Sequence, residues 1–405
     1  MNLNFNMVKK PKKEDEIIED EEEFELEEEK EQRVKNDAAR KRMFTMMGII
    51  VGGMILLLLV LFIMSMFTSK TYSFTEIEKI VKDAAISYFK DHPESLPMDE
   101  ESVVEIDSSN LVVAEKMKDL SEYTKEGVLC SATVQVEKSG EEYLYTPYLN
   151  CGENYATEEL YKRLIKDENL VNSGYGLYAV NGAYVYRGES VNNYVKLDKS
   201  LWRIVKITAN NNIVLVSNEG MLYSQPWDNR YNPEKYMGSG FNTYSTSRIK
   251  EYLEKIYDNP NEKTGELILS NSDKAKMVPF NLCTGKKDAT SEAKDNVEEC
   301  NEVIQNQRVG LLTLSDYLSA SIDPKCVNSL SKTCQNYNYL SNKNAFWLIT
   351  PDSADSTSVF AVEDTGVVKS QYASNYYSVR PVIYLNSKVL YKSGDGTLEK
   401  PYKLK

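Results

Sequence analysis

The chain has 405 residues, which allows two or three domains, and it carries 61 acidic residues against 48 Lys and Arg, for a net charge of −13. Because nucleic-acid binding requires a basic footprint, this balance argues against a nucleic-acid partner. The single histidine, His92, stands beside Pro93 in a linker-like stretch, which excludes a histidine base and histidine-rich zinc sites. We therefore expect no catalytic residue, no cofactor and no metal.

Residues 1–42 are polar and charged, with thirteen acidic residues between Glu14 and Glu31. A segment with so little apolar material to bury is predicted to be a disordered acidic cytoplasmic tail, in which residues 21–31 could form a transient helix. Such a tail would suit a basic partner, or it would simply remain solvated.

Residues 43–67, MFTMMGIIVGGMILLLLVLFIMSMF, are uncharged and long enough to cross a hydrocarbon core of about 30 Å. Three basic residues, 40–42, precede this run, whereas only Lys70 follows it closely. The positive-inside rule therefore predicts a single-pass span in contact with membrane lipid, with the N-terminus in the cytoplasm and the C-terminal part outside the cell. A cleaved signal peptide is disfavoured, because the leading region is long and acidic and no A-x-A site follows.

Gly48 and Gly52 form a small-xxx-small pair within this span. Such a pair would allow two copies to pack as a homodimer, although glycines are also common in membrane spans for other reasons.

Residues 70–160 are predicted to form a small membrane-proximal α+β domain. The pattern from Ser73 to Glu76 is typical of a capping box, and the helix that it begins should end before Pro93. In residues 130–151, apolar and polar side chains alternate on either side of a turn at Ser139 and Gly140, as in a β-hairpin. Residues 130 and 151 lie symmetrically about that turn, so they should face each other across the two strands.

Residues 170–405 are predicted to form a second α+β domain with many short strands. Strands are expected at 184–186, 202–205, 213–216, 346–349, 359–362 and 379–385, with helices at 245–257 and 313–319. A further short helix, at 157–166, should lead into this domain. Strands and helices do not alternate regularly, so a nucleotide-binding Rossmann-like fold is not indicated.

All six cysteines lie after the apolar run, at Cys130, Cys151, Cys283, Cys300, Cys326 and Cys334. An even number confined to the outer side of a membrane is typical of disulfides. Of the fifteen possible pairings, the sequential one is the simplest.

Five motifs follow one another in the C-terminal half: WRIV at 202–205, SRIKEYL at 247–253, FWLITP at 346–351, GV at 366–367 and VRPVIYL at 379–385. In this order and spacing they resemble the motifs of a family of unknown function found in surface proteins of low-GC Gram-positive bacteria. The family is similar to the C-type-lectin-like fold of formylglycine-generating enzymes and variable binding proteins. The resemblance implies this fold for residues 175–400. Ile349 and Thr350 replace an Arg-Ser pair of the family, so any role of that Arg in the family cannot be assigned to this chain.

The densest polar and aromatic cluster is Gln225–Tyr231. Aromatic faces stack on sugars while polar side chains supply hydrogen bonds, so a ligand site is one hypothesis; a packed turn with a core Trp is the alternative. The candidate ligand residues are Trp227, Asp228, Asn229, Arg230 and Tyr231. Farther along, Arg380 lies in a strand that looks buried, and we expect it to pair with an acid; a role in ligand binding is the alternative.

Together these features favour a membrane-anchored extracellular recognition or adhesion protein that is not an enzyme and binds a glycan, a cell-wall component or a protein. Two alternatives remain. The chain could be a structural or assembly component of an envelope complex, or a formylglycine-generating-like enzyme, which would need a reactive cysteine pair.

The excess of basic residues before residues 43–67 predicts which side of the membrane each end of the chain lies on. Protease added outside intact cells that express the chain should degrade the C-terminal part and leave a short N-terminal fragment, because only the part after the span is accessible. A protected C-terminal part would contradict this orientation; cells lysed before digestion provide the control.

Overall fold

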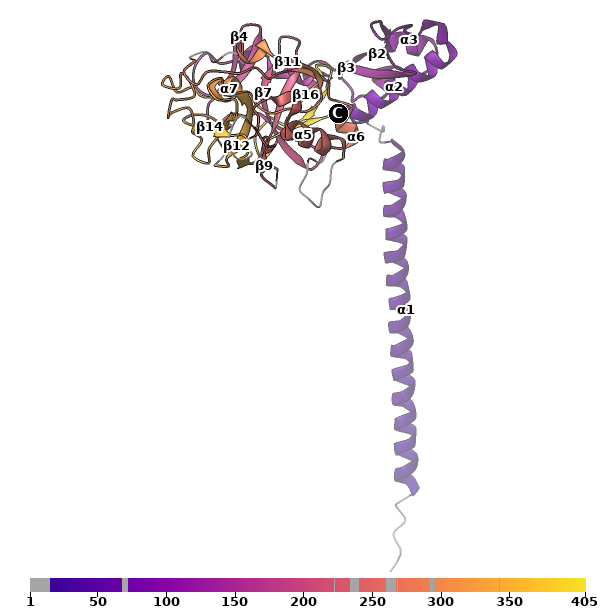
Figure 1. Ribbon diagram of the computed structural model, residues 1–405. Helices are drawn as coiled ribbons and strands as arrows, with labels where there is room; N and C mark the ends of the chain where they lie inside the picture. The colour runs from indigo at the N-terminus through magenta and orange to yellow at the C-terminus, as the bar shows by residue number, and fades with distance from the viewer. Residues whose placement is uncertain are drawn as a thin grey trace, which may run out of the picture. The chain divides into compact units, whose positions relative to one another are not determined.

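The computed structural model describes residues 15–67, 72–221, 223–233, 240–259, 267, 269–291, 294, 296–341 and 343–405. The described residues fall into two compact units, one drawn from residues 1–77 and 119–128 and the other from residues 78–118 and 129–405 (Figure 1).

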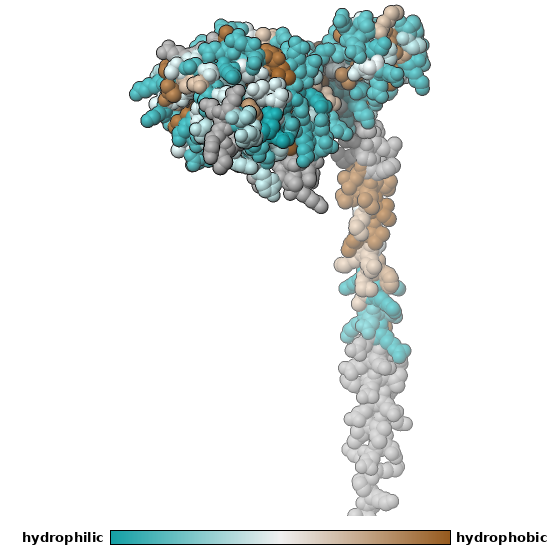
Figure 2. Space-filling view, in the orientation of Figure 1, coloured by the Kyte–Doolittle hydropathy of each residue, from teal (hydrophilic) through white to brown (hydrophobic). Residues whose placement is uncertain are grey.

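The first unit contains α1 (Asp15–Phe67), one continuous helix that includes the whole apolar run 43–67. Its stretch Arg33–Leu61 is exposed throughout and is long and apolar enough to cross a membrane. Figure 2 shows the side chains of this stretch changing from hydrophilic to hydrophobic along the helix.

The expectation that residues 1–42 are disordered is wrong for residues 15–42, which are helical; residues 1–14 lie outside the described part of the chain. Glu, Lys, Arg and Ala, which dominate this segment, are strong helix formers, and the apolar run supplies a helix that they can extend.

A second helix, α2 (Phe74–Asp91), begins at the expected capping box. The Glu76 carboxylate accepts from the Ser73 backbone N–H at 2.8 Å, and the Ser73 hydroxyl accepts from the Glu76 N–H at 3.3 Å. The helix ends before Pro93, because proline offers no backbone N–H to continue it. A short turn, η2 (Leu120–Glu122), completes the described elements of the first unit.

The boundary between the units falls inside α2, and its residues from 78 onward belong to the second unit. Their buried side chains, including Phe89, pack against a small antiparallel sheet of β1 (Val103–Asp107), β2 (Ser131–Ser139) and β3 (Glu142–Asn150). Ser131 pairs with Asn150 and Ser139 with Glu142, so the hairpin has the register expected from its symmetry. Short elements lie around it: η1 (Pro93–Ser95), α3 (Ser108–Val113), η3 (Gly152–Asn154), α4 (Leu160–Leu164) and η4 (Asp167–Asn169).

Backbone hydrogen bonds tie the segment that follows this hairpin to the C-terminal part of the same unit. Leu160 N–H donates to Val389 at 2.8 Å, and Tyr391 N–H donates to Glu158 at 3.0 Å. The expected small and large domains therefore share main-chain pairing.

The main sheet of the second unit has eight strands in the order β16-β8-β7-β6-β18-β17, with β5 beside β7 and β4 beside β5. All pairs are antiparallel except β18 with β6. The strands are β4 (Gly176–Val180), β5 (Ala183–Arg187), β6 (Tyr194–Leu197), β7 (Ser200–Ile207), β8 (Ile213–Ser217), β16 (Val382–Leu385), β17 (Tyr391–Ser393) and β18 (Tyr402–Leu404).

Smaller sheets pack on the same hydrophobic core. They are β12 (Phe346–Pro351), β13 (Ser358–Val362) and β14 (Val368–Tyr372); β10 (Phe280–Cys283) and β11 (Val303–Gln307); and β9 (Gln225–Pro226) with β15 (Tyr376–Tyr377). Every residue of β12 and β13 is buried, which explains their continuous apolar runs. The helices of this part are α5 (Arg248–Asp258), α6 (Asn271–Lys274) and α7 (Leu314–Ser319), with the turns η5 (Tyr244–Thr246) and η7 (Glu299–Asn301).

Three disulfides staple the second unit: Cys130–Cys151, Cys283–Cys300 and Cys326–Cys334. This is the sequential pairing favoured by the sequence. Each closes a loop of 8 to 21 residues, and restricting such a loop in the unfolded chain stabilises the fold by about 2–4 kcal/mol.

Arg380 is buried as expected, but its predicted pairing with an acid is wrong. Its guanidinium donates to the carbonyl oxygens of Ser217 at 3.0 Å and Leu340 at 2.9 Å, and it lies 4.8 Å from the Phe346 ring. Burial, reinforced by the nearby Arg203, lowers the pKa of Arg380 to about 10. One of these carbonyls belongs to the last residue of β8 and the other to a turn residue, so this buried cation is bound by backbone oxygens and not by a carboxylate.

Buried tyrosines make stability fall at alkaline pH. Burial raises the pKa of the phenols of Tyr186, Tyr244, Tyr317 and Tyr339 above the ordinary value. These phenols stay neutral in the folded protein, whereas in the unfolded chain they ionise near pH 10. Their contribution to the free energy of unfolding is therefore fully present below pH 10 and is lost as the pH rises above it. Each such tyrosine should reduce the free energy of unfolding by about 1.4 kcal/mol per pH unit.

An alkaline titration that follows tyrosinate absorbance and circular dichroism together measures this effect. We expect part of the tyrosinate signal to appear only as the fold is lost. Complete ionisation with an intact dichroism spectrum would contradict the prediction.

Candidate functional site

Two tryptophans bind the segment around β9 to strand β12. The Trp227 indole N–H donates to the Leu348 carbonyl at 3.2 Å, and the Trp347 indole N–H donates to the Gln225 carbonyl at 2.8 Å. Both rings are fully buried. Because each indole crosses to the other segment, these reciprocal bonds fix the position of the chain from residue 225 to residue 227.

The next two charged residues of the cluster pair with each other. Asp228 is fully buried and accepts from the backbone N–H of Arg230 at 2.9 Å and from its Nε at 2.9 Å. The Arg230 Nη2 binds the same carboxylate and also donates to the Thr246 hydroxyl at 3.3 Å. This hydrogen bonding raises the pKa of Arg230, whose side chain remains one-third exposed.

A glycine is required beside Asp228. Gly240 has φ +80°, and a Cβ there would lie 1.9 Å from the Asp228 carbonyl oxygen. The Gly240 carbonyl accepts from the buried Asn232 amide at 2.9 Å, so these two residues are bound to each other.

An open depression of about 380 Å³ lies on the surface next to this anchored segment. Its first wall is β9 with Asn229, and its second is Tyr376 of β15, which pairs with Pro226. The third wall is the outer face of α5. The lining residues are Gln225, Pro226, Asn229, Arg248, Glu251, Tyr252, Lys255 and Tyr376.

The helical wall presents its polar side because its apolar side is buried. Ile249, Leu253 and Ile256 face the core, which leaves residues 248, 251, 252 and 255 outward at helical spacings of three and four. The helix starts at Ser247, whose hydroxyl accepts from the Lys250 N–H at 3.3 Å. The depression therefore combines an ion pair, Arg248 with Glu251 at 2.9 Å, with an exposed lysine and a half-buried tyrosine.

The opposite wall carries the most exposed aromatic side chain of the depression. Tyr376 is 65% exposed, beside Pro226 and near the amides of Gln225 and Asn229. The site therefore offers flat apolar faces with amide donors and acceptors at their edges.

The structure separates the five residues expected to form a ligand site. Trp227 and Asp228 have no exposed surface, so neither can contact a ligand, which corrects that expectation for both. The Trp227 ring is buried in the core, where its indole binds Leu348 of β12, and the Asp228 carboxylate binds Arg230. Asn229 lines the depression, Arg230 is partly exposed, and Tyr231 is 72% exposed outside the lining.

Sequence reasoning missed Tyr376 and the α5 wall. The α5 residues could have been found, since the apolar stripe of the helix defines its polar face. No local signal places Tyr376 opposite Pro226, because this contact joins two-residue strands about 150 positions apart.

A second polar cluster is enclosed in the core around Glu299. Its carboxylate accepts from the Thr350 hydroxyl at 2.5 Å and from the Ser315 N–H at 3.3 Å, while Lys287 Nζ donates to the Ser315 hydroxyl at 2.9 Å. Burial raises the pKa of Glu299. None of the four residues is more than slightly exposed, so the cluster holds the core together and offers no open surface to a substrate.

Among the residues that the structure describes, no three His, Cys, Asp or Glu side chains gather as metal ligands would. No family model, curated protein or solved structure matches the chain.

The buried positions of the cluster predict the cost of removing each side chain. Trp227→Ala should lower the free energy of unfolding by about 3–5 kcal/mol, because it leaves a cavity and an unpaired carbonyl in the core. Asp228→Ala should cost about 2–3 kcal/mol, because it removes charge-assisted hydrogen bonds that Arg230 and its backbone make. Thermal or denaturant unfolding of the full chain measures both changes.

Asn229→Ala is the matched control, since this neighbour is exposed and should change stability by no more than about 0.5 kcal/mol. An Asp228→Ala protein as stable as the wild type would contradict the buried ion pair.

Proposed function

We propose that this chain is a non-enzymatic membrane-anchored recognition protein. Residues 43–67 anchor it with the N-terminus in the cytoplasm, and the disulfide-stapled second unit is displayed outside the cell. The proposal also assigns residues 170–405 to a C-type-lectin-like fold, on the order of the motifs at 202–205, 247–253 and 379–385. The apolar stretch of α1 and the three disulfides support the anchored, extracellular part of the proposal.

The ligand that we propose is a polyhydroxylated polymer such as a surface or cell-wall glycan. The observation that carries this choice is the open depression with the exposed Tyr376 beside Pro226. An open site accepts part of an extended chain, whereas an enclosed apolar pocket would select a small molecule. Sugar rings have apolar faces that stack on Tyr, and their hydroxyls match the amides of Gln225 and Asn229.

The charges on α5 add to this match. Arg248 and Glu251 neutralise each other, and Lys255 leaves one positive charge on the wall. In a protein with a net charge of −13, this local balance lets an anionic or neutral polymer approach where most of the surface would repel an anion.

Replacement of one tyrosine tests the site. In the full chain held in detergent micelles, Tyr376→Ala should weaken capture of glycans and cell-wall fragments by about 1–2 kcal/mol, or roughly five- to thirtyfold, because it removes the stacking face. A glycan array together with pull-down on insoluble wall material measures the effect.

Tyr372→Ala is the matched control. Tyr372 is 57% exposed on β14 but does not line the depression, so its loss should leave capture unchanged. Equal capture by Tyr376→Ala and wild type, or equal loss in both variants, would contradict the assignment of this site.

A further inference from the structure

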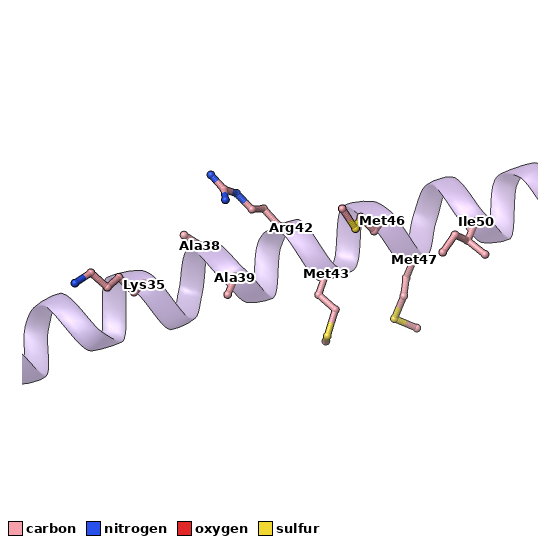
Figure 3. A pocket seen from close by; sticks show the side chains of 8 residues that line it. All are labelled: Lys35, Ala38, Ala39, Arg42, Met43, Met46, Met47 and Ile50. Carbon is pink, nitrogen blue, oxygen red and sulfur yellow. The ribbon is translucent and has the colours of Figure 1, made fainter.

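Two hollows outside the depression beside Tyr376 differ in how they are built. The hollow along α1 is lined by one exposed helix alone, so no second element encloses a ligand there (Figure 3). The other is a pocket of about 380 Å³ within the second unit, and its lining comes from the segments 152–158, 163–166 and 391–392. Three separate segments would surround a ligand on several sides, which a single helix cannot do.

Backbone hydrogen bonds and a disulfide hold the walls of this pocket together. The Tyr391 N–H donates to the Glu158 carbonyl at 3.0 Å, which joins the first segment to the third. Just before the first segment, the Cys151 N–H donates to the Tyr155 carbonyl at 2.7 Å, and Cys151 is also bonded to Cys130. The walls are therefore fixed before any ligand binds, which lowers the entropic cost of binding.

Arg163 is held in the pocket with one edge of its guanidinium left over. The guanidinium lies 4.2 Å from the centre of the Tyr391 ring, and its Nη1 donates to the Glu158 carboxylate at 2.8 Å. Within the part of the chain that the structure describes, its Nε and Nη2 donate to no protein acceptor. Because a guanidinium carries its donors in a planar fork, this edge can bind two oxygens of one anion.

The charges of the lining leave an excess of positive charge. Arg163 and Lys166 share the single carboxylate of Glu158, with the Lys166 Nζ 3.0 Å from its Oε2. Lys392 is exposed and pairs with no acid among the described residues, while Glu153 supplies one opposing charge. The lining thus carries three positive and two negative charges in a protein whose net charge is −13. An anion that most of the surface repels would be attracted here.

The other groups of the lining suit a ligand that carries hydroxyls. Asn154 and Glu153 are exposed and present oxygens that accept hydrogen bonds, and the half-buried Tyr155 and Tyr391 add ring surface. A volume of about 380 Å³ lies at the small end of the range of about 300–1,000 Å³ that is typical of small-molecule sites. One or two sugar rings with an anionic group match both the size and the chemistry.

We propose that this pocket binds a carboxylated or phosphorylated sugar. The Nε and Nη2 of Arg163 bind the anionic group, and Lys166 and Lys392 add positive charge around it. Asn154 and Glu153 accept hydrogen bonds from the sugar hydroxyls. The proposal gives the second unit a site that selects anions, and it depends neither on the membrane anchor nor on the glycan site proposed above.

The test titrates the full chain in detergent micelles with glucuronate, glucose-6-phosphate and glucose by isothermal titration calorimetry. The wild type should bind glucuronate or glucose-6-phosphate about tenfold more tightly than glucose, and added salt should weaken that binding. The comparison of the two anions shows whether the site prefers a carboxylate or a phosphate. Arg163→Lys keeps the charge but loses the fork, so it should weaken binding of the anion by about tenfold.

Two exposed positions should give opposite effects, which loss of folding cannot imitate. Lys392→Gln should weaken binding by roughly two- to fivefold. Glu153→Gln keeps an acceptor for hydroxyls and removes the opposing charge, so it should strengthen binding by roughly the same factor. Lys403→Gln is the matched control, because Lys403 is also exposed, lies on the neighbouring strand β18 and does not line the pocket. Its binding should equal that of the wild type.

Several results would overturn the site, with circular dichroism showing that each variant keeps the fold. They are binding of glucose as tight as that of both anions, binding of neither anion, and wild-type affinity in Arg163→Lys. Unchanged or weaker binding in Glu153→Gln would also overturn it, as would equal losses in Lys392→Gln and Lys403→Gln. None of these results concerns glycan capture through Tyr376, so the two proposals can fail separately.

Discussion

Two crossed indole hydrogen bonds, from Trp227 to Leu348 and from Trp347 to Gln225, hold the surface site in position. The strands that meet there, β9 and β15, have only two residues each and could not pair stably alone. Their position is instead fixed by these bonds to β12, which is completely buried. The Ile249 N–H extends the same anchor to α5 by donating to the Trp227 carbonyl at 2.9 Å. All three walls of the depression thus depend on one buried junction.

This arrangement explains why the densest cluster of polar and aromatic residues is only partly at the surface. A loop that presents Asn229 must be tied down, and the buried Trp227 and Asp228 tie it. In one short segment, some polar and aromatic side chains are therefore buried and hold the loop in place, while others are exposed and line the depression. Composition alone cannot tell the two groups apart, because stacking on a sugar and filling a core both favour aromatic residues.

Features set by local spacing could be predicted from the sequence. The capping box at Ser73, the hairpin register between Cys130 and Cys151, and the amphipathic helix α5 all depend on residues that are near in the chain. Features set by distant contacts could not. Arg380 donates to the backbone carbonyl oxygens of Ser217 and Leu340, both far from it in the chain, and Tyr376 pairs with Pro226. The prediction of disorder for residues 15–42 is wrong for a different reason: Glu, Lys and Arg carry the charge that is typical of disordered segments, but they are also strong helix formers.

The open form of the depression also bears on how such a protein would work. A shallow site with one exposed tyrosine and a few amides buries little surface, so each contact with a polymer would be weak. The membrane attachment proposed above would change this balance, because many copies confined to one surface would meet a repeating polymer at high effective concentration. Weak single contacts would then sum to firm attachment that remains reversible. The disulfides would suit the same role, because each closes a short loop in the unit that we propose to be extracellular.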